Sequence, residues 1–203
     1  MVLLARTTNG GINWSFLYDT YTTNYEYITF FGNSTGYVGG VGYDGTLLAK
    51  TTDCGANWTR LSSIPVSRDV IFMKVFSTNK ILYLGSTTTS GTCMQSIDGG
   101  YSWLNINVDS LPGELSSASF VGQESIITVT REGSVLRSND CGVHWINVFQ
   151  NNNLGLHSIS FKDSTNGIIC GSYGELLKST NGGMNWFHLS SNVTLEIEQK
   201  LLY

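Results

Sequence analysis

Four pairs of residues in this sequence could carry chemistry, because each sets a carboxylate beside, or one residue from, a tyrosine or an arginine. The eight candidate ligand-binding residues are Tyr43, Asp44, Arg68, Asp69, Arg131, Glu132, Tyr173 and Glu175. Two carboxyl groups held about 5 to 9.5 Å apart can hydrolyse a glycosidic bond. Tyrosine rings stack on sugars and on apolar side chains, and polar groups bind hydroxyls or amides. The chemistry predicted for these residues is therefore recognition of a glycan or a peptide, with glycoside hydrolysis as the catalytic alternative.

The other reactive side chains form no catalytic or metal-binding pattern. The histidines His144, His157 and His188 share no face of a predicted element. We expect four free thiols, at Cys54, Cys93, Cys141 and Cys170. No CxxC or Cys/His spacing indicates zinc, and no nucleophile lies beside a base in the sequence. We therefore predict no catalytic residue, no metal and no cofactor.

Composition favours short strands joined by tight turns. Among 203 residues there are 23 Gly and 2 Pro, 41% are hydrophobic and 12% aromatic, and no window has helical periodicity. Only 13% are charged and the net charge is −4, so nucleic acid is not an expected partner. Apolar runs such as Ile81 to Leu84 are too short to span a bilayer, and the first residues lack the features of a signal peptide.

One motif, Ser/Thr-x-Asp/Asn-x-Gly-x-x-Trp, occurs five times and must position these residues. Its tryptophans are 44, 45, 42 and 41 residues apart. The motif residues assigned a structural role are Asn9, Trp14, Asp53, Trp58, Asp98, Trp103, Asp140, Trp145, Asn181 and Trp186. We expect the Asp or Asn to close an Asx-type turn through N–H groups two residues on, the Gly to take a positive φ, and the Trp to pack between sheets. An Asn at two of the five positions argues against acid–base catalysis by this residue.

Each repeat contains enough apolar segments for four strands. Segments such as Gly174 to Lys178 lead into the motif as a third strand, and segments such as Ile168 to Gly171 precede them as a second. First strands are predicted around Phe30, Phe76, Phe120 and Phe161. A fourth strand follows each Trp. Four antiparallel strands per period make one blade of a β-propeller.

These residues resemble the BNR or Asp-box propellers, and most closely the photosystem II stability/assembly-factor-like group. The match includes all five motifs and the segments 32–40 and 163–171, with the pattern Asn-Ser-Thr-Gly-Tyr or its equivalent before a second strand. The resemblance implies a propeller fold and an extracytoplasmic or secreted protein. The Asp-box also occurs in sialidases, endoglucanases, sorting receptors and assembly factors, so it says little about activity.

Aligned on the motif, the chain predicts one propeller over residues 1–203, with about five blades' worth of strands. A half-blade covers 1–18, blades cover about 26–62, 70–108, 115–149 and 156–189, and a lone strand covers 195–203. The first strand and the third strand of a meander run parallel, so the two ends do not join simply. We therefore expect an incomplete ring, or a piece of a longer propeller.

Strand direction places the eight candidates on the face opposite the motifs. That face is also predicted to carry Glu26, Asp109, Asn151–Asn153 and His157. Variable loops on a rigid scaffold are where propellers usually bind. The sequence thus favours a noncatalytic scaffold that binds a protein or a glycan. The alternatives are a glycoside hydrolase of the sialidase or endoglucanase type, and a structural piece of a larger secreted protein; too few arginines lie on the proper face for a sialidase.

Overall fold

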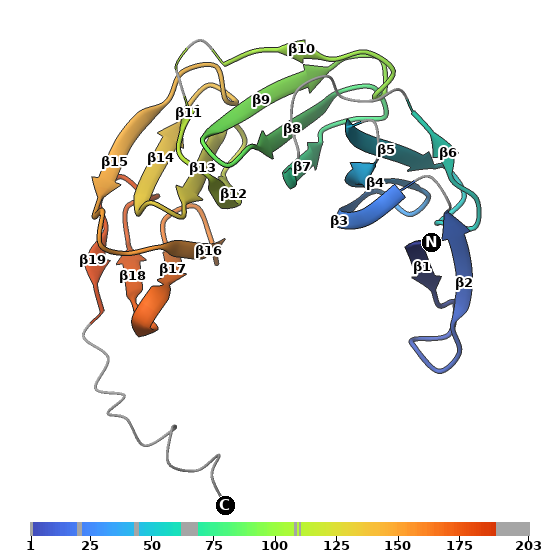
Figure 1. Ribbon diagram of the computed structural model, residues 1–203, viewed down its shortest axis with the longest axis horizontal. Helices are drawn as coiled ribbons and strands as arrows, with labels where there is room; N and C mark the ends of the chain where they lie inside the picture. The colour runs from blue at the N-terminus through green and yellow to red at the C-terminus, as the bar shows by residue number, and fades with distance from the viewer. Residues whose placement is uncertain are drawn as a thin grey trace, which may run out of the picture. The chain divides into compact units, whose positions relative to one another are not determined.

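The computed structural model describes residues 2–19, 22–42, 45–61, 69–107, 109 and 111–189. These residues form strands β1 to β19 and a single 3-10 turn, and no other helix occurs among them (Figure 1). The strands make one two-stranded, one five-stranded and three four-stranded sheets. The strand pairs are antiparallel, and the all-β fold of propeller blades is confirmed.

The strands belong to two compact units. The first consists of Met1–Leu115 and Asp140–Trp145, the second of Ser116–Asn139 and Ile146–Tyr203. That residues 1–203 form a single propeller stays a prediction. The predicted strand at 195–203 lies outside the described residues, as do Tyr43, Asp44 and Arg68.

The first unit contains a hairpin and two sheets. The hairpin pairs β1 (Val2–Arg6) with β2 (Ser15–Asp19). The next sheet is built of β3 (Thr22–Phe31), β4 (Thr35–Gly42), β5 (Gly45–Thr51) and β6 (Thr59–Arg60). The third is built of β7 (Asp69–Val75), β8 (Ile81–Ser86), β9 (Ser90–Ser96), β10 (Leu104–Asn105) and β11 (Leu111–Pro112). Sequence reasoning missed β11, and it placed Phe76 within a first strand that ends at Val75.

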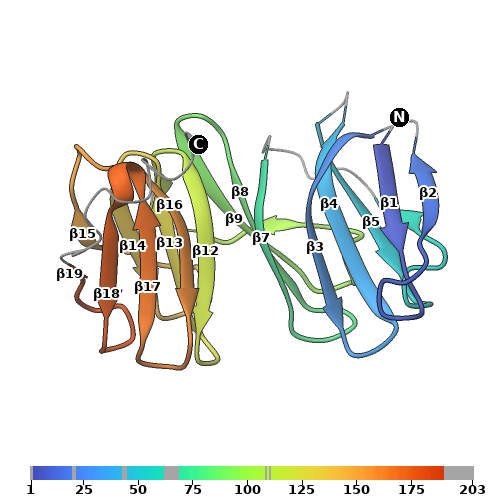
Figure 2. The ribbon, with the colours of Figure 1, turned by 90° about the horizontal axis from the view of Figure 1, so that it is seen from below.

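The second unit contains two four-stranded sheets (Figure 2). One is built of β12 (Leu115–Val121), β13 (Ser125–Thr130), β14 (Ser134–Ser138) and β15 (Ile146–Gln150). The other is built of β16 (Leu156–Phe161), β17 (Gly167–Gly171), β18 (Leu176–Ser179) and β19 (Phe187–His188), with the 3-10 turn η1 (Ser172–Gly174) between β17 and β18.

Each unit has its own core between neighbouring sheets. In the first unit the buried cluster includes Tyr37, Met73 and Tyr83, with the ring of Trp103 packed against Tyr83. In the second unit the cluster is formed by Val121, Ile127, Val129, Val135, Leu156, Ile159, Ile169, Leu177 and Trp186. Successive side chains of a strand point to opposite faces, so the last sheet buries Ile169 while Ile168 and Cys170 are exposed.

The motif turns are held by more hydrogen bonds than the sequence predicted. In the third copy Ser96 Oγ accepts the Gly100 N–H at 2.8 Å, and Asp98 Oδ1 accepts the N–H groups of Tyr101 and Ser102 at 3.0 and 2.9 Å. The donors are therefore three and four residues after the Asp, not two. The Trp103 indole N–H donates to the Gly100 carbonyl at 3.1 Å. The motif is confirmed as a turn, with the Ser or Thr hydroxyl as a second acceptor.

The three motifs with Asp use the second carboxylate oxygen as well. This oxygen accepts from the side chain four residues on, which is Asn57 Nδ2 at 2.8 Å, Ser102 Oγ at 2.5 Å or His144 Nδ1 at 2.7 Å. These bonds favour the charged carboxylate. The Asn57 backbone N–H lowers the pKa of Asp53 to about 2, and the Ser102 hydroxyl lowers that of Asp98 to about 2. The carboxylates of Asp53 and Asp98 are thus held ionised as hydrogen-bond acceptors.

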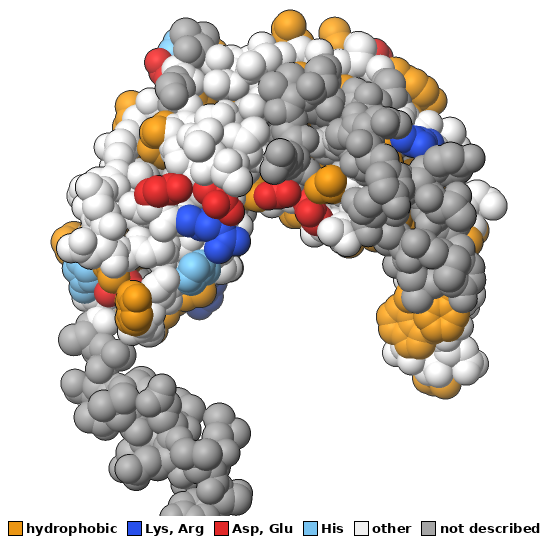
Figure 3. Space-filling view, viewed as in Figure 1, with side chains coloured by type: hydrophobic (Ala, Val, Ile, Leu, Met, Phe, Trp, Pro, Cys, Tyr) orange, Lys and Arg blue, Asp and Glu red, His pale blue; other side chains and the backbone are white. Residues whose placement is uncertain are grey.

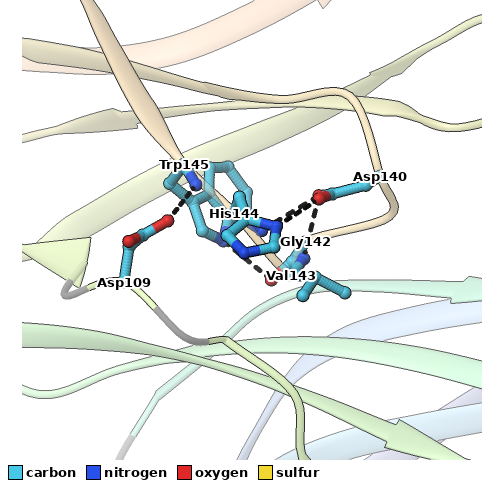
Figure 4. A network of polar contacts seen from close by, with 6 residues as sticks. All are labelled: Asp109, Asp140, Gly142, Val143, His144 and Trp145. Atoms are coloured by element: carbon cyan, nitrogen blue, oxygen red, sulfur yellow. Dashed lines mark hydrogen bonds and ion pairs between the residues drawn. The ribbon is translucent and has the colours of Figure 1, made fainter.

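The fourth motif adds a contact from the preceding crossover segment (Figure 4). Asp109 Oδ2 accepts the Trp145 backbone N–H at 2.9 Å, beside the Asp140–His144 pair. The hydrogen bond to Asp140 raises the pKa of His144, and the charges of Asp140 and Asp109 act in the same direction. This contact places Asp109 at a motif turn, so its predicted position on the opposite face was wrong.

Candidate functional site

Four of the eight candidate residues lie on two hairpin turns of the second unit. Arg131 and Glu132 form the turn between β13 and β14. Tyr173 lies in η1, and Glu175 is the residue that follows η1. Arg131, Glu132 and Tyr173 are exposed, whereas Glu175 is half-buried. Strand direction puts both turns at the end of the sheets opposite the motif turns, as the sequence predicted.

The crossover between β15 and β16 joins these two turns into one surface, which we call the rim. Asn151 N–H donates to the Gly133 carbonyl at 3.0 Å, and Ser172 N–H donates to the Gly155 carbonyl at 2.8 Å. A Cβ at Gly155 would lie 2.9 Å from Ser172 Oγ and 3.2 Å from the Arg131 carbonyl oxygen. The crossover therefore packs closely between the two turns at this position. We define the rim as 131–133, 151–155 and 172–175.

Tyr173 has a backbone that L-residues with a side chain rarely adopt. Its φ and ψ are 58° and 27°, and the following Gly174 has φ 76°. Two successive residues at positive φ form a type I′ hairpin turn, in which Asn or Gly is preferred at both positions. A left-handed residue other than Gly costs about 1 to 2 kcal/mol. The ring is 97% exposed, so no packing within the protein offsets this cost.

Glu175 makes a side-chain contact with a histidine that the sequence analysis missed. Its Oε1 lies 2.5 Å from His188 Nδ1, and the His188 ring meets Phe149 edge to face at 5.9 Å between centroids. The pairing of β18 with β19, with Leu177 opposite His188, brings these side chains together. The register of two short strands thus fixes the Glu175 carboxylate. A second histidine, His157, contacts Ser172 Oγ through Nε2 at 2.9 Å.

The rim is polar and of mixed charge. The Gln150 side chain donates to the Glu132 carbonyl at 3.3 Å, which ties the β13–β14 turn to the end of β15. Charged side chains of both signs are sparse among neutral groups on the face seen in Figure 3. Such a surface offers hydrogen-bonding groups around one exposed aromatic ring, and it does not provide the dense basic field that binds phosphate backbones.

Asp69, another of the eight candidates, lies in the first unit near Glu26. It begins β7, where the neighbouring Val70 N–H donates to Glu26 Oε2 at 2.9 Å, and Tyr83 Oη donates to the Asp69 carbonyl at 3.3 Å. Partial burial raises the pKa of Glu26, and the negative charge of Asp69 adds to this. Glu26 on β3 and Asp69 on β7 therefore form an acidic pair within this unit.

The described residues hold no other arrangement typical of an active site. No three His, Cys, Asp or Glu side chains in the described ranges are grouped so as to hold a metal ion. All four cysteines are unbridged. No helix in the described part of the chain is long and apolar enough to cross a membrane.

The repeated motif turns on four-stranded antiparallel sheets define an Asp-box β-propeller protein. The family model of the photosynthesis system II assembly factor YCF48 matches residues 10–154, and the chain belongs to this family. This match confirms the resemblance seen in the motifs. No curated protein matches the chain.

Solved structures agree on the fold. YCF48 bound to D1 peptide is similar with a TM-score of 0.62 and 16% identity, over 92% of this chain and 75% of that chain. YCF48 from Cyanidioschyzon merolae gives 0.63 and 15%, over 93% and 78%. An ancestral GH74 enzyme gives 0.65 and 20%, over 85% of this chain but 25% of that chain. At these identities the likeness extends to the fold alone.

Proposed function

We propose that this chain is a noncatalytic scaffold that binds an extended segment of another protein at the rim. Its family is that of an assembly factor, and one solved relative is YCF48 bound to D1 peptide. The observation that carries the proposal is Tyr173, an exposed ring on a strained backbone. A tyrosine at a turn position where Asn or Gly is preferred calls for an explanation outside the turn, and exposed tyrosines are frequent binding hot spots.

The residues around Tyr173 suit a peptide. The Glu175 carboxylate, oriented by His188, accepts from a peptide N–H or a basic side chain, and the Arg131 guanidinium pairs with a carboxylate. Asn152 and Asn153 in the crossover are exposed and add amide donors and acceptors. A glycan could bind to the same ring and amides. We prefer a protein partner because the family is that of an assembly factor. The proposal also includes that the protein is secreted.

Fluorescence anisotropy with a labelled D1 peptide tests this function. We expect Tyr173→Ala to weaken binding by about 2 kcal/mol, or roughly thirtyfold in Kd, which is the range for a hot-spot tyrosine. Tyr173→Gly removes the ring and relieves the backbone strain, so it should lose binding while keeping the fold. Tyr101→Ala is the matched control, because Tyr101 is an exposed tyrosine in a motif turn. Equal affinity of the wild type and both Tyr173 variants would refute the assignment.

A second candidate function, glycoside hydrolysis, draws on the Glu26–Asp69 pair. A carboxyl with a raised pKa beside a second carboxyl is the pattern of an acid and its partner. Turnover of aryl glycosides and soluble glucans by the wild type, abolished in Asp69→Asn and retained in Glu132→Gln, would support an enzyme. No turnover by the wild type would exclude these substrates.

A further inference from the structure

Three of the motif turns pack their second glycine against the sheet that precedes them, whereas a Cβ at Gly55 of the second motif would contact only its own repeat. A Cβ at Gly183 would lie 2.1 Å from Ile127 Cδ1, one at Gly142 would lie 2.4 Å from Cys93 Sγ, and one at Gly100 would lie 2.7 Å from Leu61 Cδ1. These three glycines are buried. Only glycine lets the turn approach so closely, so the contact is a built feature of the packing between repeats.

A cation reinforces the same contact. Arg137 Nε donates to the Gly182 carbonyl at 3.2 Å, and Arg6 Nε donates to the Cys54 carbonyl at 2.9 Å. The Lys50 ammonium lies at Gly99, where it would be 2.9 Å from a Cβ. Each of these cations lies eight residues before the Trp of its own motif. The residue that it contacts lies four residues before the Trp of the next motif. A basic side chain of one repeat thus holds the motif turn of the following repeat.

The β16–β19 sheet carries the same two elements, and they are exposed. Lys178 is eight residues before Trp186, as Arg137 is before Trp145. Ile168 is eighteen residues before Trp186, as Ile127 is before Trp145, yet Ile168 is 49% exposed and Ile127 is 0%. A groove of about 450 Å³ covers this face and is lined by Ser160, Lys162, Asn166, Gly167, Ile168 and Lys178. We call it the socket, because its surface matches the one that receives a motif turn elsewhere.

The β1–β2 hairpin carries a motif turn of the complementary kind. A Cβ at Gly11 would contact only Trp14 of its own turn, at 3.8 Å. Trp14 is 52% exposed, whereas Trp186 is 6% exposed. Ile12 and Phe16 are exposed beside it, and Figure 3 shows hydrophobic side chains grouped at this hairpin. The hairpin thus presents an apolar motif turn. Gly10, the first glycine of this motif, is an exposed residue that carries the carbonyl equivalent to that of Gly182.

We propose that the socket binds the β1–β2 motif turn of a second copy of this chain. In that contact Lys178 donates to the Gly10 carbonyl, as Arg137 donates to the Gly182 carbonyl inside the second unit. Gly11 packs on Ile168, as Gly183 packs on Ile127. The occupant is chosen because this chain itself carries the matching turn. The contact is heterologous, since different surfaces of the two copies meet, and it produces head-to-tail dimers or longer chains.

Sedimentation velocity over a wide range of protein concentration tests the contact. The wild type should associate reversibly as concentration rises. Lys178→Glu should raise the dissociation constant at least about tenfold, because it removes the donor and sets a carboxylate against a carbonyl. Ile168→Asn should have a similar effect through lost apolar contact. Lys80→Glu, the same charge change on an exposed turn of the first unit, is the matched control.

Association that is lost in both socket variants and kept in Lys80→Glu supports the proposal. A wild type that stays monomeric throughout, whether the turn is left free or taken up within one molecule, overturns it. Association that is unchanged by Lys178→Glu and Ile168→Asn also overturns it. Circular dichroism of each variant establishes that the sheets remain folded.

Discussion

Replacing Gly183 by alanine measures how tightly a motif turn packs on the sheet before it. The new Cβ would lie 2.1 Å from Ile127 Cδ1 and 3.2 Å from Phe161 Cζ, and Ile127 is fully buried. Overpacking of this kind costs about 1 to 3 kcal/mol. The backbone at φ 79° adds about 1 to 2 kcal/mol for a residue with a Cβ. We therefore expect a total loss of about 3 kcal/mol in the free energy of unfolding.

Gly11→Ala is the control, because it shares the backbone cost without the clash. Its φ is 91° and the nearest atom to a new Cβ is 3.8 Å away. We expect it to cost about 1 kcal/mol. Urea unfolding followed by circular dichroism, at protein concentrations below any self-association, gives both values. In a thermal melt, the same free-energy losses correspond to a fall in Tm of about 6 to 12 °C for Gly183→Ala and about 2 to 4 °C for Gly11→Ala. Equal losses would refute the packing argument.

Three further predictions concern the motif turns. Trp186→Ala should destabilise by about 3 to 5 kcal/mol and Trp14→Ala by less than half of that, in the same urea assay, because Trp186 is buried and Trp14 is half exposed. The pKa of Asp98 is lowered to about 2, so its contribution to stability is present above its usual pKa and is lost as pH falls through about 2; acid titration of Asp98→Asn should lack this loss. The pKa of His144 is raised by Asp140, so its contribution is full below its usual pKa and is lost as pH rises through the raised value; NMR titration should show the raised pKa in the wild type and a lower one in Asp140→Asn.

Much of the fold follows from the sequence because the motif is local. A hydroxyl, a carboxylate or amide, a glycine and a tryptophan within eight residues build each turn, and the spacing of five copies fixes the repeat. The details that failed depend on distant partners. Asp109 was misplaced because its acceptor role involves the backbone of Trp145, which is 36 residues away. The pairing of Arg137 with the Gly182 carbonyl spans 45 residues and becomes visible only once two sheets pack together.

The candidate site was predictable in part. Hairpin direction alone places Arg131, Glu132, Tyr173 and Glu175 on one end of the sheets. The Glu175–His188 pair depends on the register of β18 and β19, and alternation of polar and apolar residues does not set the register of a two-residue strand such as β19. Gly174 signals a tight turn in the sequence, but the left-handed backbone of Tyr173 follows from the hairpin type. That backbone conformation is therefore a property of the folded chain.

Hydrogen exchange with and without a D1 peptide tests the central claim, that the rim is the protein-binding surface, most directly. We expect slower exchange on peptide addition in the rim segments 131–133, 151–155 and 172–175. Exchange in the motif turns at 98–103 and 181–186 should be unchanged. Protection confined to the motif turns, or bound peptide with no protection of the rim, would contradict it.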